Sequence, residues 1–183
     1  MDSAHTLPPS RAHSNHPHHA ATSLDFTSVF LPSCIEMIRP ASEKSSVISL
    51  LIQSLVCEGR IDPAHAEEII RGLIEHERHG TSAIGKGLAF PHLRTAEVKE
   101  FVGAIGVAPD GIDFGSLDHD PTKLVFLTLS PRDGREQHIQ LLSRLVRLMQ
   151  DKAVNMQLHH RLRPQDVYEY LSDLDEQNRS TTA

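Results

Sequence analysis

The chain has 183 residues, 39% of them hydrophobic, which suits one domain of ordinary size with a packed core and a modest tail. Its formal net charge of −6 at pH 7 argues against a nucleic-acid binder, because affinity for a phosphate backbone requires clustered lysines and arginines. No apolar run is long enough to insert in a membrane, and the first residues lack the apolar stretch of a secretory signal. We therefore expect a cytoplasmic protein, with Cys34 and Cys57 as reduced thiols.

The first 23 residues differ from the rest of the chain in composition. They are rich in proline and histidine: Pro8, Pro9, Pro17, His5, His13, His16, His18 and His19. Because so little apolar surface is present to offset the entropy lost on ordering, we predict a disordered tail over residues 1–23. The composition favours a plain extension over a dedicated metal site. The domain is then expected over residues 24–176, with a flexible C-terminus over 177–183.

Two amphipathic helices are predicted in the first half of the domain. Residues 42–58 carry apolar side chains at helical spacing, with Ser42 as the N-cap and Gly59 as a left-handed stop. A second helix over residues 62–77 begins with Asp62 as its cap, followed by a proline in the first turn, where a missing N–H is harmless.

The hydrophobic period then changes to that of strands. Residues 87–90 form a short apolar run ended by Pro91, which favours an extended backbone at the residue before it. Residues 101–108 and 123–130 are apolar and β-branched enough to be central strands of a sheet. Residues 109–115 hold turn formers and are expected to connect these two strands.

Three helices are predicted at the C-terminal end. The first covers residues 133–151, where Asp133 and Glu136 have the spacing of a capping box. A shorter helix follows near residues 154–162, and the last begins at Pro164. Helices are thus predicted both before and after the strands in the sequence. This order predicts an α/β fold, in which helices cover both faces of a mixed, short-stranded sheet.

Two short motifs suggest other functions and are rejected. Residues 78–81 contain the Arg-His-Gly string of histidine phosphatases, but that string must follow a buried strand, and here it follows a helix. Gly85-Lys86-Gly87 resembles part of a phosphate-binding loop, yet it lacks the remaining Walker spacing and is followed by a strand instead of a helix.

The strongest functional signal is the stretch Glu77–His92, ERHGTSAIGKGLAFPH. It resembles the phosphorylation-site signature of type-2 enzyme IIA domains of the phosphoenolpyruvate-dependent phosphotransferase system, the fructose, mannitol and nitrogen types. In that signature an acidic residue, a Gly-rich turn and a short apolar strand lead to Ala, a hydrophobic residue, Pro and the active histidine. The similarity continues in residues 112–115, in the strand over 124–129 and in His138 near the start of a helix, and it covers about residues 31–174.

The resemblance implies the enzyme IIA sandwich fold and a phosphohistidine site. His92 is the implied phosphoacceptor, and His138 is the second histidine that lies beside it and helps to hold the phosphoryl group. The physical chemistry agrees, since a neutral imidazole is a good nitrogen nucleophile and Pro91 restricts the backbone just before His92. His138 is expected in the first turns of a helix, where free N–H groups and the helix dipole favour an anion.

Three positions depart from the pattern of this family. Ser82-Ala83 stands where many members have Thr-Gly, and Leu93 follows the active histidine where glycine is common. His76 occupies the position of an arginine that faces the phosphate in some members. Arg78 and Arg94 are the candidates to replace that charge.

The resemblance implies that the chain accepts phosphate from the histidine phosphocarrier protein and passes it to an enzyme IIB for sugar uptake, without a cofactor. The chain is too short to include the IIB and membrane IIC domains, so a second role stays open. In that role a nitrogen-type enzyme IIA controls partner proteins through its phosphorylation state. A metal-dependent hydrolase is disfavoured, because no HExxH or similar ligand pair occurs.

Overall fold

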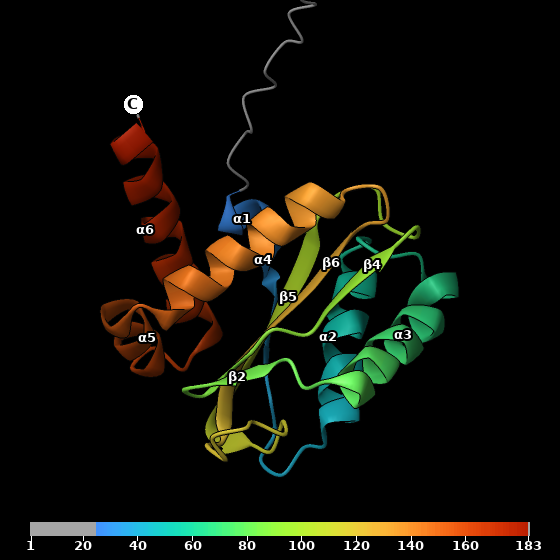
Figure 1. Ribbon diagram of the computed structural model, residues 1–183, viewed down its shortest axis with the longest axis horizontal. Helices are drawn as coiled ribbons and strands as arrows, with labels where there is room; N and C mark the ends of the chain where they lie inside the picture. Colours follow the sequence, from blue (N-terminus) through green and yellow to red (C-terminus); the bar gives the residue numbers. More distant parts are fainter. Residues whose placement is uncertain (1–24, 183) are drawn as a thin grey trace, which may run out of the picture.

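A six-stranded mixed sheet forms the middle layer of the protein, and helices pack on both of its faces (Figure 1). The computed structural model describes residues 25–182. The strand order is β1-β5-β6-β3-β2, and β4 also pairs with β6. Only the β5–β6 and β2–β3 pairs are antiparallel among the described strands. The strands are β1 (Phe30–Met37), β2 (Ala83–Gly85), β3 (Leu88–Ala89), β4 (His92–Thr95), β5 (Val102–Ile112) and β6 (Thr122–Pro131).

The helices form two groups, one on each face of the sheet. Helices α2 (Lys44–Cys57) and α3 (Ala66–His79) cover one face, and α4 (Arg135–Gln150), α5 (Lys152–His159) and α6 (Pro164–Thr182) cover the other (Figure 1). The short helix α1 (Phe26–Val29) packs against α6, and a 3-10 turn, η1 (Pro63–His65), leads into α3. No helix within residues 25–182 has the length and apolar character needed to cross a membrane.

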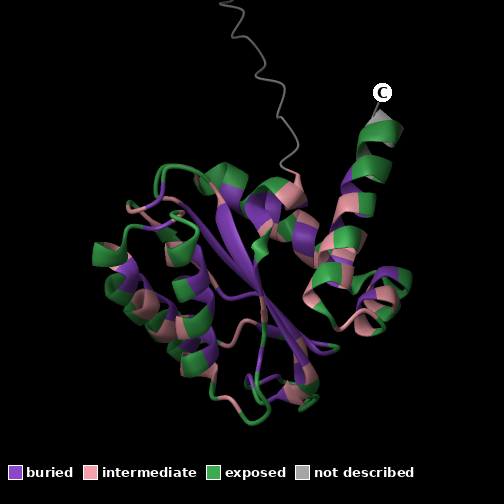
Figure 2. Ribbon diagram, turned by 180° about the vertical axis from the view of Figure 1, so that it is seen from behind, coloured by how far each residue is buried: buried purple, intermediate pink, exposed green. Residues whose placement is uncertain are grey.

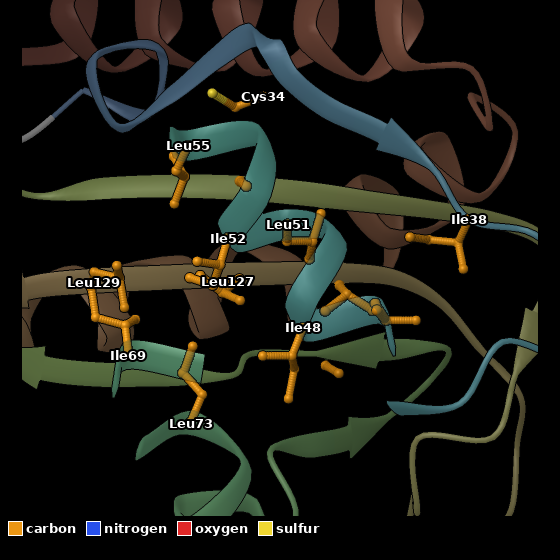
Figure 3. Close-up of a cluster of buried hydrophobic side chains, with 14 of the residues drawn as sticks. Cys34, Ile38, Ile48, Leu51, Ile52, Leu55, Ile69, Leu73, Leu127 and Leu129 are labelled. Carbon is orange, nitrogen blue, oxygen red and sulfur yellow. The ribbon is translucent and has the colours of Figure 1, made fainter. Parts of the chain in front are cut away.

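The central strands supply both hydrophobic cores, because successive side chains of a strand point to opposite faces. In β6, Val125, Leu127 and Leu129 pack against α2 and α3, whereas Leu124 and Phe126 pack on the side of α4 to α6. Figure 3 shows the first of these cores, and Figure 2 shows buried residues along the central strands and the inward sides of the helices. The predicted fold, a mixed sheet with helices on both faces, is confirmed.

The cap predictions at the first two helices are partly confirmed. Helix α2 ends as predicted, because Gly59 has φ +67° and its N–H closes the last turn. Its start is different: the N-cap is Glu43, and the Ser42 hydroxyl donates backwards to the Arg39 carbonyl instead of capping the helix. Asp62 is a cap as predicted, although it caps η1, the 3-10 turn that precedes α3.

The capping box predicted at the start of α4 is wrong. The helix begins at Arg135 with Gly134 as its N-cap, and no side chain of the described residues caps it. Glu136 therefore lies one position too early to reach back in a box with Asp133. Helix α5 also begins earlier than predicted, because Asp151 accepts hydrogen bonds from the N–H groups of the first turn.

The strands depart from the sequence prediction at four places. Strands β1, β2 and β4 were not predicted, and β5 continues to Ile112 through residues assigned to a turn. Gly111 has φ +75°, which lets β5 bulge before Ile112 rejoins β6 opposite Thr122.

The sequence analysis expected a flexible end over residues 177–183, whereas helix α6 includes residues 177–182. The helix can continue there because no Gly or Pro follows Pro164. The domain limits stay a prediction, and the tail over residues 1–23 lies outside the described residues.

Two neighbouring leucines of α2 provide a test of the first core. Leu51 is 0% exposed and Leu50 is 39% exposed, so Leu51→Ala leaves a cavity and Leu50→Ala does not. We expect Leu51→Ala to lower the free energy of unfolding by about 2–5 kcal/mol, and Leu50→Ala by less than about 1 kcal/mol. Urea denaturation followed by circular dichroism measures both. Equal losses in the two variants would contradict the assignment of this core.

Candidate active site

Strands β3 and β4 are two parts of one strand along β6, separated by Phe90 and Pro91. Both parts are parallel to β6 and keep the same register on either side of the break. The ladder continues through the break, because the Pro91 carbonyl accepts the Thr128 N–H at 2.9 Å. The paired residues are Leu88 with Leu124, Ala89 with Val125, and His92 with Thr128. His92 therefore opens β4, directly after the break.

The ring of His92 is held by the backbone of its own segment. Its Nδ1 lies 2.8 Å from the carbonyl oxygen of Phe90. A carbonyl oxygen can only accept, so Nδ1 carries the proton and Nε2 of the neutral ring keeps a free lone pair. Burial is the main cause that lowers the pKa of His92, and the nearby His76 lowers it further. The ring is thus kept neutral near pH 7, as a nitrogen nucleophile must be.

His138 lies beside His92, as predicted. Its side chain is 6% exposed, and the two ring centroids are 5.4 Å apart. It is the fourth residue of α4, and its Nδ1 lies 2.6 Å from the Ser130 hydroxyl oxygen on β6. Burial, followed by the charges of His92, Arg94 and His76, lowers the pKa of His138 to about 4.

His76 brings a third imidazole to the same place. It comes from α3, and its ring meets that of His92 edge to face, with centroids 4.9 Å apart and planes at 69°. His76 is exposed, unlike His138. The structure therefore gathers three predicted site residues, His76, His92 and His138, from one strand and from helices on opposite faces of the sheet.

The two candidate arginines are placed differently. Arg94 is two residues after His92 on β4, pairs in register with Ser130, and contributes to the lowered pKa of His138. Arg78 is 73% exposed on its side chain and forms an ion pair with Glu75 at 3.3 Å. Arg94 is therefore the candidate cation beside the histidines.

Glu77 is a buried charge near the site that the sequence analysis did not assign. It is 8% exposed, its Oε2 lies 3.0 Å from Lys44 Nζ, and it accepts the Ser82 N–H at 3.2 Å. After burial and the Phe90 hydrogen bond, its charge is a smaller influence on the pKa of His92 and raises it. The sequence did contain a signal: Glu77 continues the buried row of α3 that includes Ile69 and Leu73.

Two buried hydroxyls of β6 were also missed. Thr128 and Ser130 are both 0% exposed and lie two residues apart, so both point to the α4 side of the sheet. Ser130 bonds His138, whereas the hydroxyl of Thr128, which pairs in register with His92, has no hydrogen-bond partner among the described residues. Polar residues at alternate positions at the end of an apolar strand are the signal that could have indicated them.

The described residues offer no obvious metal site. Within residues 25–182, no group of three or more His, Cys, Asp or Glu side chains is arranged to hold a metal ion. The three imidazoles offer nucleophilic and hydrogen-bonding nitrogens, and Arg94 is a fixed positive charge beside them.

Comparisons with known proteins show the family to which the chain belongs. Residues 28–174 match the family described as phosphoenolpyruvate-dependent sugar phosphotransferase system, EIIA 2. The chain is 31% identical over 156 residues to the PTS system fructose-specific EIIA component of Haloferax volcanii, which covers 84% of this chain and 100% of that protein. It is 28% identical over 137 residues to the nitrogen regulatory protein of Bradyrhizobium diazoefficiens, which covers 75% of this chain and 90% of that protein.

A solved structure shows the same fold. The nitrogen regulatory protein IIA-Ntr of Neisseria meningitidis matches with a TM-score of 0.69 at 24% identity, covering 79% of this chain and 97% of that one. The chain belongs to the EIIA 2 family of the phosphotransferase system, as the signature at residues 77–92 indicated. It is thus a phosphotransferase component of the class that carries phosphohistidine.

The lowered pKa of His138 predicts how stability depends on pH. In the unfolded chain an imidazole titrates near pH 6.5, so between pH 6.5 and about 4 the unfolded state binds more protons than the folded one. The contribution of the neutral His138 to the free energy of unfolding is complete above pH 6.5, and we expect on the order of 3 kcal/mol of it to be lost as the pH falls to 4.

Urea denaturation at a series of pH values measures this loss, and His138→Gln should flatten the profile in that window. The matched control is His160→Gln, at an exposed histidine, which should leave the profile unchanged. An NMR titration should place the midpoint of His138 near pH 4. A midpoint close to 6.5 would show that burial does not disfavour its charged form.

Proposed function

We propose that the chain is a phosphoryl carrier in which His92 accepts a phosphoryl group from the histidine phosphocarrier protein and passes it to an enzyme IIB. One observation carries the proposal: the Nδ1–H of His92 is held by the Phe90 carbonyl, which leaves Nε2 free beside His138. A half-buried, oriented and neutral imidazole is what a phosphoryl acceptor requires.

The transfer step follows from the tautomer of His92. The lone pair of Nε2 forms the new N–P bond as the N–P bond of the donor phosphoimidazole breaks, and that bond's electron pair stays on the donor nitrogen. A donor ring protonated on its second nitrogen then leaves as neutral imidazole. The phosphorylated His92 ring keeps its proton on Nδ1 and carries the positive charge, which the Phe90 carbonyl stabilises.

His138 is suited to bind the phosphoryl oxygens without competing as an acceptor. We assign the Ser130 hydroxyl as the donor to Nδ1 of His138, which places the proton of the neutral ring on Nε2. That N–H is then available to donate to the phosphoryl group on His92. The uncapped first turn of α4 adds free backbone N–H groups, and Arg94 adds a positive charge.

Two roles are candidates for the phosphorylated protein. Relay to an enzyme IIB for sugar uptake is supported by the similarity to a protein named fructose-specific EIIA component. Control of partner proteins through the phosphorylation state is supported by the similarity to a protein named nitrogen regulatory protein. Both roles need the same phosphorylated His92, so the first experiment tests the site and the second separates the roles.

The site is tested by phosphorylation in a reconstituted relay. The protein is incubated with labelled phosphoenolpyruvate, enzyme I and the phosphocarrier, and acid-labile phosphate is mapped by mass spectrometry. We expect label on His92, its complete loss in His92→Ala, and normal labelling of His160→Ala. Label on another histidine, or label that survives in His92→Ala, would overturn the proposal.

His138→Ala tests the second imidazole. Removing a single preorganised donor from a charged transition state typically slows catalysis by about a hundredfold, so we expect a comparable fall in the rate of His92 phosphorylation. Rapid-quench measurement gives this rate, and circular dichroism checks that the variant is folded. An unchanged rate in a folded variant would remove His138 from the site.

Addition of candidate enzyme IIB proteins to the labelled carrier separates the two roles. Rapid loss of label from His92 with label gained by a IIB protein supports the relay. Label that stays on His92 with every IIB protein, while binding to a partner changes with phosphorylation, supports the regulatory role.

A further inference from the structure

We propose that His76 is a titratable positioning residue of this site: its protonated ring holds the phosphoryl group on His92, so that the phosphorylated state is favoured by low pH. This inference rests on the proposed phosphorylation of His92. It concerns a residue of α3, on the side of His92 away from the helix that supplies His138, and its signature is a pH profile.

The geometry places His76 where it can reach a group attached to His92. The two ring centroids are 4.9 Å apart in an edge-to-face arrangement. In His92 and His138, Nδ1 is already occupied by Phe90 and Ser130 respectively. Neither nitrogen of His76 has a hydrogen bond to another described residue, so both remain available to a ligand.

The carboxylates near His76 already have other partners. Glu75 pairs with Arg78 and lies close to His79, and the buried Glu77 pairs with Lys44 of α2. The groups near His76 from β4 and α4 are the imidazoles of His92 and His138, and Arg94 is a further positive charge close to His138. A proton on His76 in the unphosphorylated protein thus meets neutral or positive neighbours.

Phosphorylation reverses this balance. A phosphoryl group on His92 brings close to two negative charges next to His76, and a nearby opposite charge raises the pKa of an imidazole by about one unit or more. His76 is exposed, so water can hydrate its protonated ring, whereas the buried His138 would carry its charge largely without hydration. It is the imidazole of the three best suited to become charged.

The coupling between proton and phosphoryl group is reciprocal. If phosphorylation strengthens proton binding at His76, protonation of His76 must stabilise the phosphorylated protein by the same factor. The equilibrium for transfer from the donor to His92 therefore shifts toward the phosphorylated carrier as the pH falls through the range in which imidazole titrates.

Variants of His76 isolate this effect from other titrations. His76→Gln keeps a neutral polar side chain, and His76→Arg carries a permanent charge. His79→Gln, three residues further along α3 at an exposed histidine, is the matched control. The equilibrium constant for phosphoryl transfer from the phosphocarrier is measured for each protein between pH 5.5 and 8.5, as a ratio to wild type, so that titrations shared by all the proteins cancel.

We expect the ratio of wild type to His76→Gln to rise about tenfold as the pH falls across this range, which corresponds to a change of one unit in the pKa of His76 on phosphorylation. The ratio of His76→Arg to His76→Gln should be high and independent of pH, and His79→Gln should follow wild type. An NMR titration should show the midpoint of His76 moving upward on phosphorylation.

The outcomes distinguish this inference from the proposed function. Normal labelling of His92, together with a wild-type profile in His76→Gln or an unmoved His76 midpoint, overturns the role of His76 and leaves the carrier function in place. Absence of label on wild-type His92 overturns both. Circular dichroism of His76→Gln and His76→Arg confirms that a changed profile does not come from unfolding.

Discussion

The hydrogen bond between the Phe90 carbonyl and Nδ1 of His92 depends on how β3 and β4 run along β6. Backbone groups of alternate residues point toward β6, as the bond from the Thr128 N–H to the Pro91 carbonyl shows, while those of Phe90 point away. The Phe90 N–H accordingly donates to the Ser82 carbonyl, and the Phe90 carbonyl is left on the open edge of the sheet, where none of the described strands competes for it. Pro91 has no N–H to contribute to the ladder, so a proline is tolerated at this break. The tautomer and orientation of His92 thus follow from strand register.

The edge position of β4 also explains why side chains from opposite faces of the sheet can meet. In the middle of a sheet, helices on the two faces are separated by the strands between them. At an edge strand, the C-terminal end of α3 and the N-terminal end of α4 can both come close to the same strand residue. These two helix ends place His76 and His138 beside His92. The two hydrophobic cores therefore do more than stabilise the fold, because the helices they hold set the spacing of the three imidazoles.

Local patterns in the sequence predicted the elements whose contacts are periodic, and they failed where distant partners decide. The helical spacing of residues 42–58 and the apolar run of 123–130 correspond to α2 and β6. Strand β4 reads His-Leu-Arg-Thr, with no strand-like hydrophobic pattern, and exists because it pairs with β6. The proximity of His92 and His138 came from a resemblance to a known signature, since nothing in the local sequence relates two residues on different elements. For Glu77, the helical spacing indicates a buried position, but the local sequence does not indicate its partner, because Lys44 lies on another helix.

A carrier must hold its phosphoryl group firmly enough to accept it and loosely enough to release it, and the composition of this site suits that requirement. Fixed positive charges around a phosphoryl group would stabilise the bound state at every pH, whereas neutral N–H donors bind it more weakly. Here the lowered pKa of His138 keeps that ring a neutral donor, and Arg94 is exposed to solvent, which screens its charge. In the proposed carrier, much of the positive charge that faces the phosphoryl group then comes from the ring of His92, which becomes positive when Nε2 forms the N–P bond, and from the proton on His76. Such charge is present while the phosphoryl group is bound and is given up when it leaves, so the affinity of the site changes with its occupancy.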